Sequence, residues 1–145
     1  PGPTGESNRL STHPRGLILC LGPTPEAALN QALTALGQGN KVVVIAAGVA
    51  NLVDLLKRQK LPVTGLEGEL EAEALSQVSG FDAVLCQAGI EQLTTFRRAL
   101  AVREGVLIPL VSDAGESHHL LLERHLCIDT TAAGGNASLI AAGDK

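Results

Sequence analysis

The chain has 145 residues, which fits one domain able to bury roughly two thirds of the surface that its unfolded form exposes. Its apolar residues are almost wholly aliphatic, and its formal net charge is −4. The one dense basic patch, at Arg97, Arg98 and Arg103, is too small for nucleic acid, because neutralising phosphates requires many converging cations. No apolar stretch approaches the roughly 20 residues that span a bilayer, so we expect a soluble protein without a transmembrane segment.

The three cysteines, Cys20, Cys86 and Cys127, each lie within an apolar run. A reduced cysteine in such a run behaves as a small hydrophobe, and an odd number of widely separated cysteines provides no disulfide framework. We therefore expect packed, reduced thiols and a cytoplasmic protein. The start at Pro1 suggests a piece of a longer chain, although removal of methionine before proline would leave the same start.

Strands and helices are predicted to alternate from residue 15 to residue 111. Leu17–Leu21 is apolar on both faces and stops at Gly22, which is typical of a fully buried strand. Thr24 is the predicted N-cap of the next helix, with Pro25 in its first turn, where a missing N–H costs nothing. The other predicted elements are strands at 41–47, 61–63, 83–86 and 107–111, and helices up to residue 37 and at 50–59, 69–79 and 91–101.

This alternation predicts an α/β fold, a Rossmann-like parallel sheet with helices on both faces. Pro62 gives its strand an edge position, because proline cannot donate to a ladder. The pattern changes after Gly115: residues 126–130 are typical of a strand, Gly134–Asn136 predicts a turn, and 137–141 could return as a partner strand. We therefore expect a C-terminal β-hairpin-like tail.

Ligands of a parallel α/β sheet bind beyond the carboxyl ends of its strands, so the loops after Leu21, Ile45, Cys86 and Val111 form the candidate site. A dinucleotide fingerprint needs three spaced glycines that open a helix, whereas the first loop offers only Gly22 and two prolines. The sequence thus gives little support for nucleotide binding.

Three side chains near these loops invite a catalytic interpretation. Cys86 ends a strand, but no basic residue lies near it in the sequence to lower its pKa, and a packed core thiol is the more common role. Asp113 and Glu116 place two carboxylates after the last strand, where solvated loop charge is the alternative to acid–base chemistry.

The histidines near the C-terminus are candidate metal ligands. His118 and His119, with His125 and Cys127, match no zinc-ligand spacing, and adjacent histidines are expected to point to different sides. We therefore expect no metal.

The tail is too apolar for a disordered terminus, and two alternatives stay open for it. It forms a hairpin on its own domain, or it docks elsewhere, because exposed strand edges recruit partners. The residues expected to carry the interaction are Leu126, Ile128, Asp129, Thr130, Thr131, Gly134, Gly135, Asn136, Ser138 and Leu139.

The two ends of the chain resemble known sequences. The lead-in 1–8, the strand opening Pro14–Gly16 and the run Leu19–Pro23 resemble the start of aldehyde dehydrogenase domains specific for glutamate semialdehyde. Residues 130–139 are similar to the terminal motif of the proline utilization A family, which is the more specific match. The resemblance implies a parent that oxidises proline with FAD, oxidises the semialdehyde to glutamate with NAD, and channels the intermediate through a tunnel.

Departures from the dehydrogenase pattern imply that this piece is not itself an enzyme. Ile45–Ala46 stands where a working domain has a lysine and a proline for the cofactor ribose, and Cys86–Gly89 replaces a Phe-Thr-Gly-Ser-like loop. Asp113–Glu116 replaces the catalytic glutamate before a glycine pair, and the segment with the nucleophilic cysteine is absent. The resemblance therefore gives this piece no catalytic or cofactor-binding residue.

We accordingly expect an irregular lead-in at 1–14, a degenerate aldehyde-dehydrogenase-like Rossmann domain at 15–115 and a tail motif at 116–145. The first hypothesis is a structural domain of an oligomeric parent. It would present the tail to the active aldehyde dehydrogenase domain of its own or a partner chain and cover the tunnel.

The alternative is a small-molecule or nucleotide-binding module without catalysis, holding a nucleotide or an acidic metabolite near Gly22, Gly89 and Gly115. An independent enzyme using Cys86 or Asp113 ranks last.

Overall fold

The computed structural model describes residues 6–129, which divide into two compact units. We call the larger unit, Pro14–Leu122, the body. The smaller unit, of which residues 6–13 and 123–129 are described, we call the ribbon. Over the part of the chain that the structure describes, no helix has the length and apolar character needed to cross a membrane.

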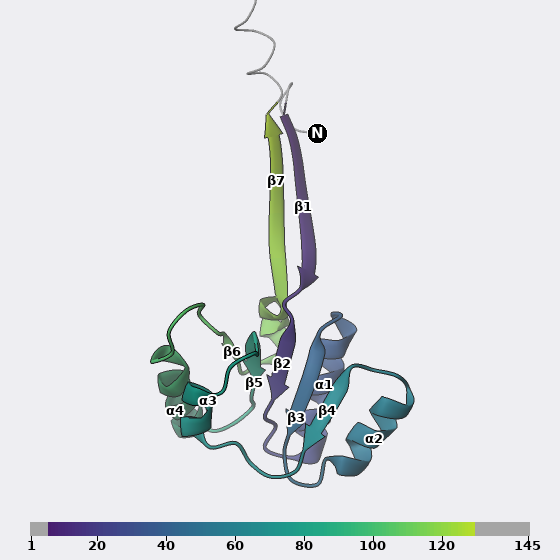
Figure 1. Ribbon diagram of the computed structural model, residues 1–145, viewed down its shortest axis with the longest axis vertical. Helices are drawn as coiled ribbons and strands as arrows, with labels where there is room; N and C mark the ends of the chain where they lie inside the picture. Colours follow the sequence, from purple (N-terminus) through teal and green to yellow (C-terminus); the bar gives the residue numbers. More distant parts are fainter. Residues whose placement is uncertain (1–5, 130–145) are drawn as a thin grey trace, which may run out of the picture. The chain divides into compact units, whose positions relative to one another are not determined.

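A five-stranded parallel sheet forms the centre of the body (Figure 1). Its strands are Leu17–Cys20 (β2), Lys41–Ile45 (β3), Val63–Leu66 (β4), Ala83–Leu85 (β5) and Leu110–Val111 (β6). They lie side by side in the order β4-β3-β2-β5-β6, so the chain builds outward from β2 to β4 and then places β5 and β6 on the other side. The predicted α/β fold is confirmed. The edge strand expected at 61–63 lies at an edge as β4, but it begins only at Val63, so Pro62 precedes it instead of lying within it.

Helices cover both faces of this sheet. They are Pro25–Gly37 (α1), Ala50–Arg58 (α2), Ala72–Gln77 (α3) and Ile90–Ala101 (α4). The predicted cap of α1 is present, since Thr24 Oγ1 accepts a hydrogen bond from the Ala27 N–H at 3.2 Å. The helix expected at 69–79 is shorter than predicted and occupies only the α3 range.

Side chains alternate across each strand and so feed two core layers. On β2, Ile18 and Cys20 belong to the layer that α1 and α2 complete, whereas Leu19 belongs to the layer that α3 and α4 complete. The in-register parallel pairing of β2 with β3 and β5 continues both layers across the sheet. The continuously apolar strands of the sequence are explained by this burial on both faces.

A buried asparagine ties three parts of the body together. Asn40 Oδ1 accepts the Gly16 N–H at 2.9 Å, and its Nδ2 donates to the carbonyl oxygens of Ala35 at 3.2 Å and Leu120 at 3.1 Å. Asn40 is 1% exposed. It therefore links the start of β2, the end of α1 and a 3₁₀ helix, Ala114–Leu120 (η1), without leaving its own polar atoms unpaired.

The last strand of the sheet is shorter than the sequence predicted. We expected a buried strand over 107–111, but β6 contains only Leu110–Val111, and Val106 and Leu107 are 85% and 86% exposed. An apolar run shows that burial would be favourable, but it does not show whether a partner surface lies within the same chain.

Residues 6–14 form a strand, whereas we predicted an irregular lead-in over 1–14. Glu6–Pro14 (β1) pairs with Leu121–Asp129 (β7) in a separate two-stranded sheet, and their arrows run in opposite directions (Figure 1). Ser11 Oγ donates to the carbonyl oxygen of Arg124, 113 positions away, at 3.4 Å. A strand whose partner is so distant leaves little local signal.

The tail prediction is met only in part by the described residues. The strand expected at 126–130 is the end of β7, which begins earlier, at Leu121. The predicted turn at Gly134–Asn136 and the return strand at 137–141 lie outside the described residues.

Two of the three cysteines are packed as predicted. Cys20 and Cys86 are buried free thiols, one in each core layer. The prediction for Cys127 was wrong, because Cys127 is exposed on β7. An apolar run in a two-stranded ribbon has no core to enter.

Candidate functional site at the carboxyl edge of the sheet

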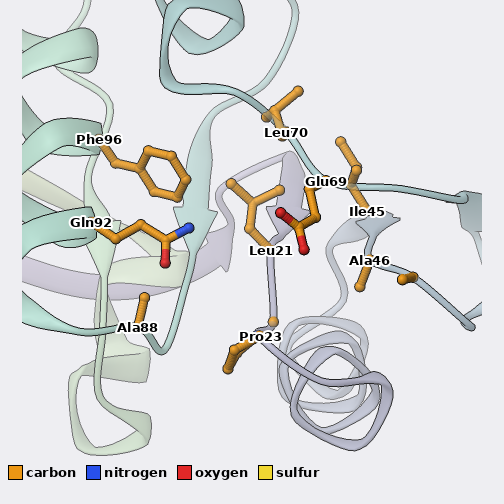
Figure 2. A pocket seen from close by; sticks show the side chains of 11 residues that line it. Leu21, Pro23, Ile45, Ala46, Glu69, Leu70, Ala88, Gln92 and Phe96 are labelled. Carbon is orange, nitrogen blue, oxygen red and sulfur yellow. The ribbon is translucent and has the colours of Figure 1, made fainter.

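A cleft of about 170 Å³ lies at the carboxyl ends of the strands, where the strand order reverses. Eleven residues line it: Leu21, Gly22, Pro23, Ile45, Ala46, Ala47, Glu69, Leu70, Ala88, Gln92 and Phe96 (Figure 2). They come from the loops after β2, β3 and β5, from the β4–α3 connection and from α4. Three of the four loops predicted to form the site, those after Leu21, Ile45 and Cys86, therefore meet here.

Apolar and polar atoms share the lining of the cleft, and two polar side chains, Glu69 and Gln92, belong to it. Leu21 and Phe96 are 6% and 4% exposed and belong to the core layer beneath α3 and α4. Figure 2 shows the Glu69 carboxylate and the Gln92 amide pointing toward Leu21 from opposite sides. Within residues 6–129, neither group takes part in a side-chain hydrogen bond. Both are therefore available to a guest molecule.

The chain that forms one side of the cleft is uniformly acidic. From Leu61 to Phe96 the sequence contains no Lys, Arg or His. Of its acidic residues, Asp82 lies at the opposite edge of the sheet, where it accepts the Leu17 N–H, and the others are Glu67, Glu69, Glu71, Glu73 and Glu91. Such a charge distribution favours cations near the cleft and disfavours anions. The alternating acidic residues after β4 are the signal in the sequence that could have predicted this acidic side of the cleft.

The N-terminus of α2 is occupied by the protein's own carboxylate. Glu67 Oε2 accepts the Gly48 N–H and Oε1 accepts the Ala50 N–H, both at 2.7 Å. The N-terminus of a helix is a common place for a phosphate, because its N–H groups are unpaired and its dipole favours negative charge. At α2 this position is filled from within the body.

Gly22 serves the packing of the first loop. A Cβ at this position would lie 2.3 Å from the backbone nitrogen of Ala28 in α1. The glycine is therefore required because helix and strand end approach closely.

The three candidate catalytic residues lie in different places: Cys86 is buried, Asp113 caps a helix and Glu116 is exposed. Burial raises the pKa of the Cys86 thiol to about 11, so it is protonated at neutral pH. Asp113 Oδ1 accepts the Gly115 N–H at 2.8 Å and caps η1. Asp113 also lines a second cavity, of about 50 Å³, beside Gln31 of α1. Glu116 is exposed.

The histidines do not assemble a ligand set. His118 and His119 lie in η1 with ring centroids 4.1 Å apart, so our expectation that they point to different sides was wrong. His125 and Cys127 lie on β7. Across the described residues, no three His, Cys, Asp or Glu side chains are close enough to hold a metal ion.

Only part of the predicted interaction tail is described. Leu126 and Ile128 are 55% and 47% exposed on β7, and Asp129 ends that strand. The other proposed tail residues lie outside the described residues: Thr130, Thr131, Gly134, Gly135, Asn136, Ser138 and Leu139.

No family model matches the chain, but curated proteins do. It is 38% identical over 148 residues to the bifunctional protein PutA of Salmonella typhimurium and 34% identical over 152 residues to that of Escherichia coli. Each alignment covers 99% of this chain and 11% of the relative. The chain thus corresponds to a small part of these proteins.

Solved structures agree with this relationship. Proline utilization A (PutA) from Bradyrhizobium japonicum matches with a TM-score of 0.68 and 30% identity, over 78% of this chain and 13% of that one. The aldehyde dehydrogenase KauB from Pseudomonas aeruginosa matches with a TM-score of 0.61 and 16% identity, over 77% of this chain and 25% of that one, which shows a shared fold. By sequence along nearly its whole length and by fold, this chain belongs to the proline utilization A family, as an aldehyde-dehydrogenase-like domain of it.

Proposed function

We propose that the chain is a non-catalytic domain of a bifunctional proline-catabolic enzyme. The parent oxidises proline to glutamate by way of glutamate semialdehyde, with FAD and NAD as its cofactors. The domain covers the channelling tunnel and makes contacts between domains or subunits. Its partner is the aldehyde dehydrogenase domain of the same or a neighbouring chain, in a cytoplasmic homo-oligomer.

The observation that carries this proposal is the exposure of the ribbon. Residues 7–10 of β1 and 122–128 of β7 are all exposed. Leu10 is 65% exposed, in addition to Leu126 and Ile128. A lone two-stranded ribbon is marginally stable in water and presents unpaired strand edges. A second surface that pairs with or covers these residues would supply the missing stabilisation.

The cleft supports the non-catalytic part of the proposal. NAD carries a negatively charged diphosphate, whereas the cleft contains Glu69 and no basic side chain. Glu67 already accepts the N–H groups at the start of α2. Ile45 at the end of β3 offers no hydrogen bond to a ribose. These residues do not fit a dinucleotide, and Cys86 is a protonated thiol in the core layer.

The test is to end the parent enzyme at residue 125, which removes half of β7 and the tail but leaves the body intact. We expect proline-dependent glutamate production to fall and semialdehyde to escape into an external trap, while proline oxidation with an artificial acceptor persists. Unchanged rates without extra leakage would show that these residues serve local packing only. As a control, residues 1–125 alone should still unfold cooperatively, which shows that the truncation leaves the body folded.

A further inference from the structure

We propose that the carboxyl-edge cleft binds a small organic monocation, a primary ammonium group on a short apolar body. This goes beyond the structural role proposed above and does not depend on it. It also reverses the charge of the ligand suggested by the sequence, which was a nucleotide or an acidic metabolite.

The volume of the cleft sets the size of the guest. Pockets for drug-sized ligands have volumes of roughly 300–1,000 Å³, and about 170 Å³ lies well below that range. The cleft therefore accepts a molecule of a few heavy atoms. A dinucleotide would leave most of its atoms outside.

The walls leave room for a short hydrocarbon body. Carbon from Leu21, Leu70 and Phe96 lines part of the cleft, Ala46 and Ala88 leave the space between them open, and polar atoms supply about half of the lining. Removing a short alkyl chain from water contributes about 0.8 kcal/mol for each buried CH₂ group. A few methylene groups are enough for weak binding, and longer chains would extend beyond the walls.

The polar groups select the charge and the donor pattern. An ammonium group has three donors and no acceptor, and the Glu69 carboxylate and the Gln92 carbonyl oxygen are acceptors. Figure 2 shows the Glu69 carboxylate and the Gln92 amide on opposite sides of Leu21, with the Gln92 nitrogen nearer to Leu21, so a half turn of the terminal amide is needed to present its carbonyl oxygen to the guest. Because the cleft contains no basic side chain and its acidic side carries Glu67 and Glu71 as well, a carboxylate or phosphate guest is repelled.

The experiment is an NMR titration of the 145-residue chain, which contains no Trp or Tyr to report binding by fluorescence. n-Butylammonium chloride replaces sodium chloride at fixed ionic strength, with n-butanol and sodium butyrate as matched guests. We expect saturable shifts at the amides of Gly22 and Ala88 and at the side chain of Gln92. The alcohol should bind more weakly, and butyrate should produce no saturable shift.

The matched variants are Glu69→Gln and Glu71→Gln, which remove the same charge from the same acidic stretch. Glu71 stands at the N-cap position of α3, but its side chain makes no capping hydrogen bond, and it does not line the cleft. Glu69→Gln should weaken butylammonium binding about fivefold, the limit for an exposed ion pair, and Glu71→Gln should leave it nearly unchanged. Equal effects of the two variants, equal binding of butanol and butylammonium, or tighter saturable binding of NAD would overturn the proposal. None of these results bears on the truncation test.

Discussion

The body and the ribbon differ in where their apolar side chains lie. In the body, most apolar side chains of the sheet strands enter one of two core layers, and the buried Asn40 finds its partners within the same unit. In the ribbon, the described strands have no core, and apolar residues such as Leu126 face outward. The body therefore buries its apolar residues within its own unit, whereas the described part of the ribbon leaves its apolar residues exposed.

The largest effect is expected at Asn40. Asn40→Ala leaves the Gly16 N–H without its partner, which costs about 1–3 kcal/mol, and removes one hydrogen bond each from the carbonyl oxygens of Ala35 and Leu120, which keep their backbone donors. We expect the free energy of unfolding to fall by about 3 kcal/mol, measured by urea denaturation with circular dichroism. Asn51→Ala, at an exposed position of α2, is the control and should change stability by less than about 0.5 kcal/mol. A loss below about 1 kcal/mol for Asn40→Ala would show that the hydrogen bonds of Asn40 contribute little to the stability of the body.

A smaller effect is expected from pH and Cys86. Its pKa is raised from 9.0 to about 11 in the folded body, so the unfolded chain loses this proton first as pH rises. The stabilisation is therefore complete below pH 9 and is lost as pH increases toward 11, by on the order of 2 kcal/mol. Urea denaturation at pH 8 and pH 10.5 should show this loss, and Cys86→Ala should reduce it.

The thiol of the ribbon provides the comparison. Cys127 is exposed, so Cys127→Ala should retain the full pH dependence. An equal reduction in Cys86→Ala and Cys127→Ala would contradict the separation of core thiols from the ribbon.

The smallest effect is expected in the ribbon itself. Changing Leu126 and Ile128 together to Asp should alter the unfolding free energy of the body by less than about 0.5 kcal/mol, because both side chains are already exposed. Ile18→Val, at a fully buried position of β2, is the matched control and should lower that free energy by about 0.5–1.5 kcal/mol. A ribbon effect above about 1 kcal/mol in the chemical denaturation of the 145-residue chain would mean that the ribbon stabilises the body directly.

The sequence predicted what local chemistry determines. The apolar run of β2 and the cap at Thr24 carry their own signals, so the first strand and helix were placed correctly. The position of the cleft followed from parallel topology, which brings the carboxyl ends of the strands together. β1 was missed because its partner is β7, near the far end of the chain, and its own Ser, Thr and His residues do not indicate a strand.

The polar chemistry of the cleft was missed for a related reason. Glu69 follows β4 and Gln92 belongs to α4, and nothing local to either residue shows that they face each other across Leu21. The prediction for Leu107 was wrong in the opposite sense, because its apolar neighbours predicted a buried strand and the residue is exposed. Side chains that meet only through tertiary structure cannot be paired from periodicity alone.

The closeness of the two points where the chain enters and leaves the body has a further consequence. The Arg15 N–H donates to the carbonyl oxygen of Leu120 at 3.1 Å, and Arg15 Nε donates to the carbonyl oxygen of His119 at 2.5 Å. A folded unit whose ends adjoin can be inserted into a host loop, or joined end to end and reopened elsewhere, without stretching its backbone. The body therefore has ends that suit insertion into a longer polypeptide or removal from it, because the connections on either side keep their spacing.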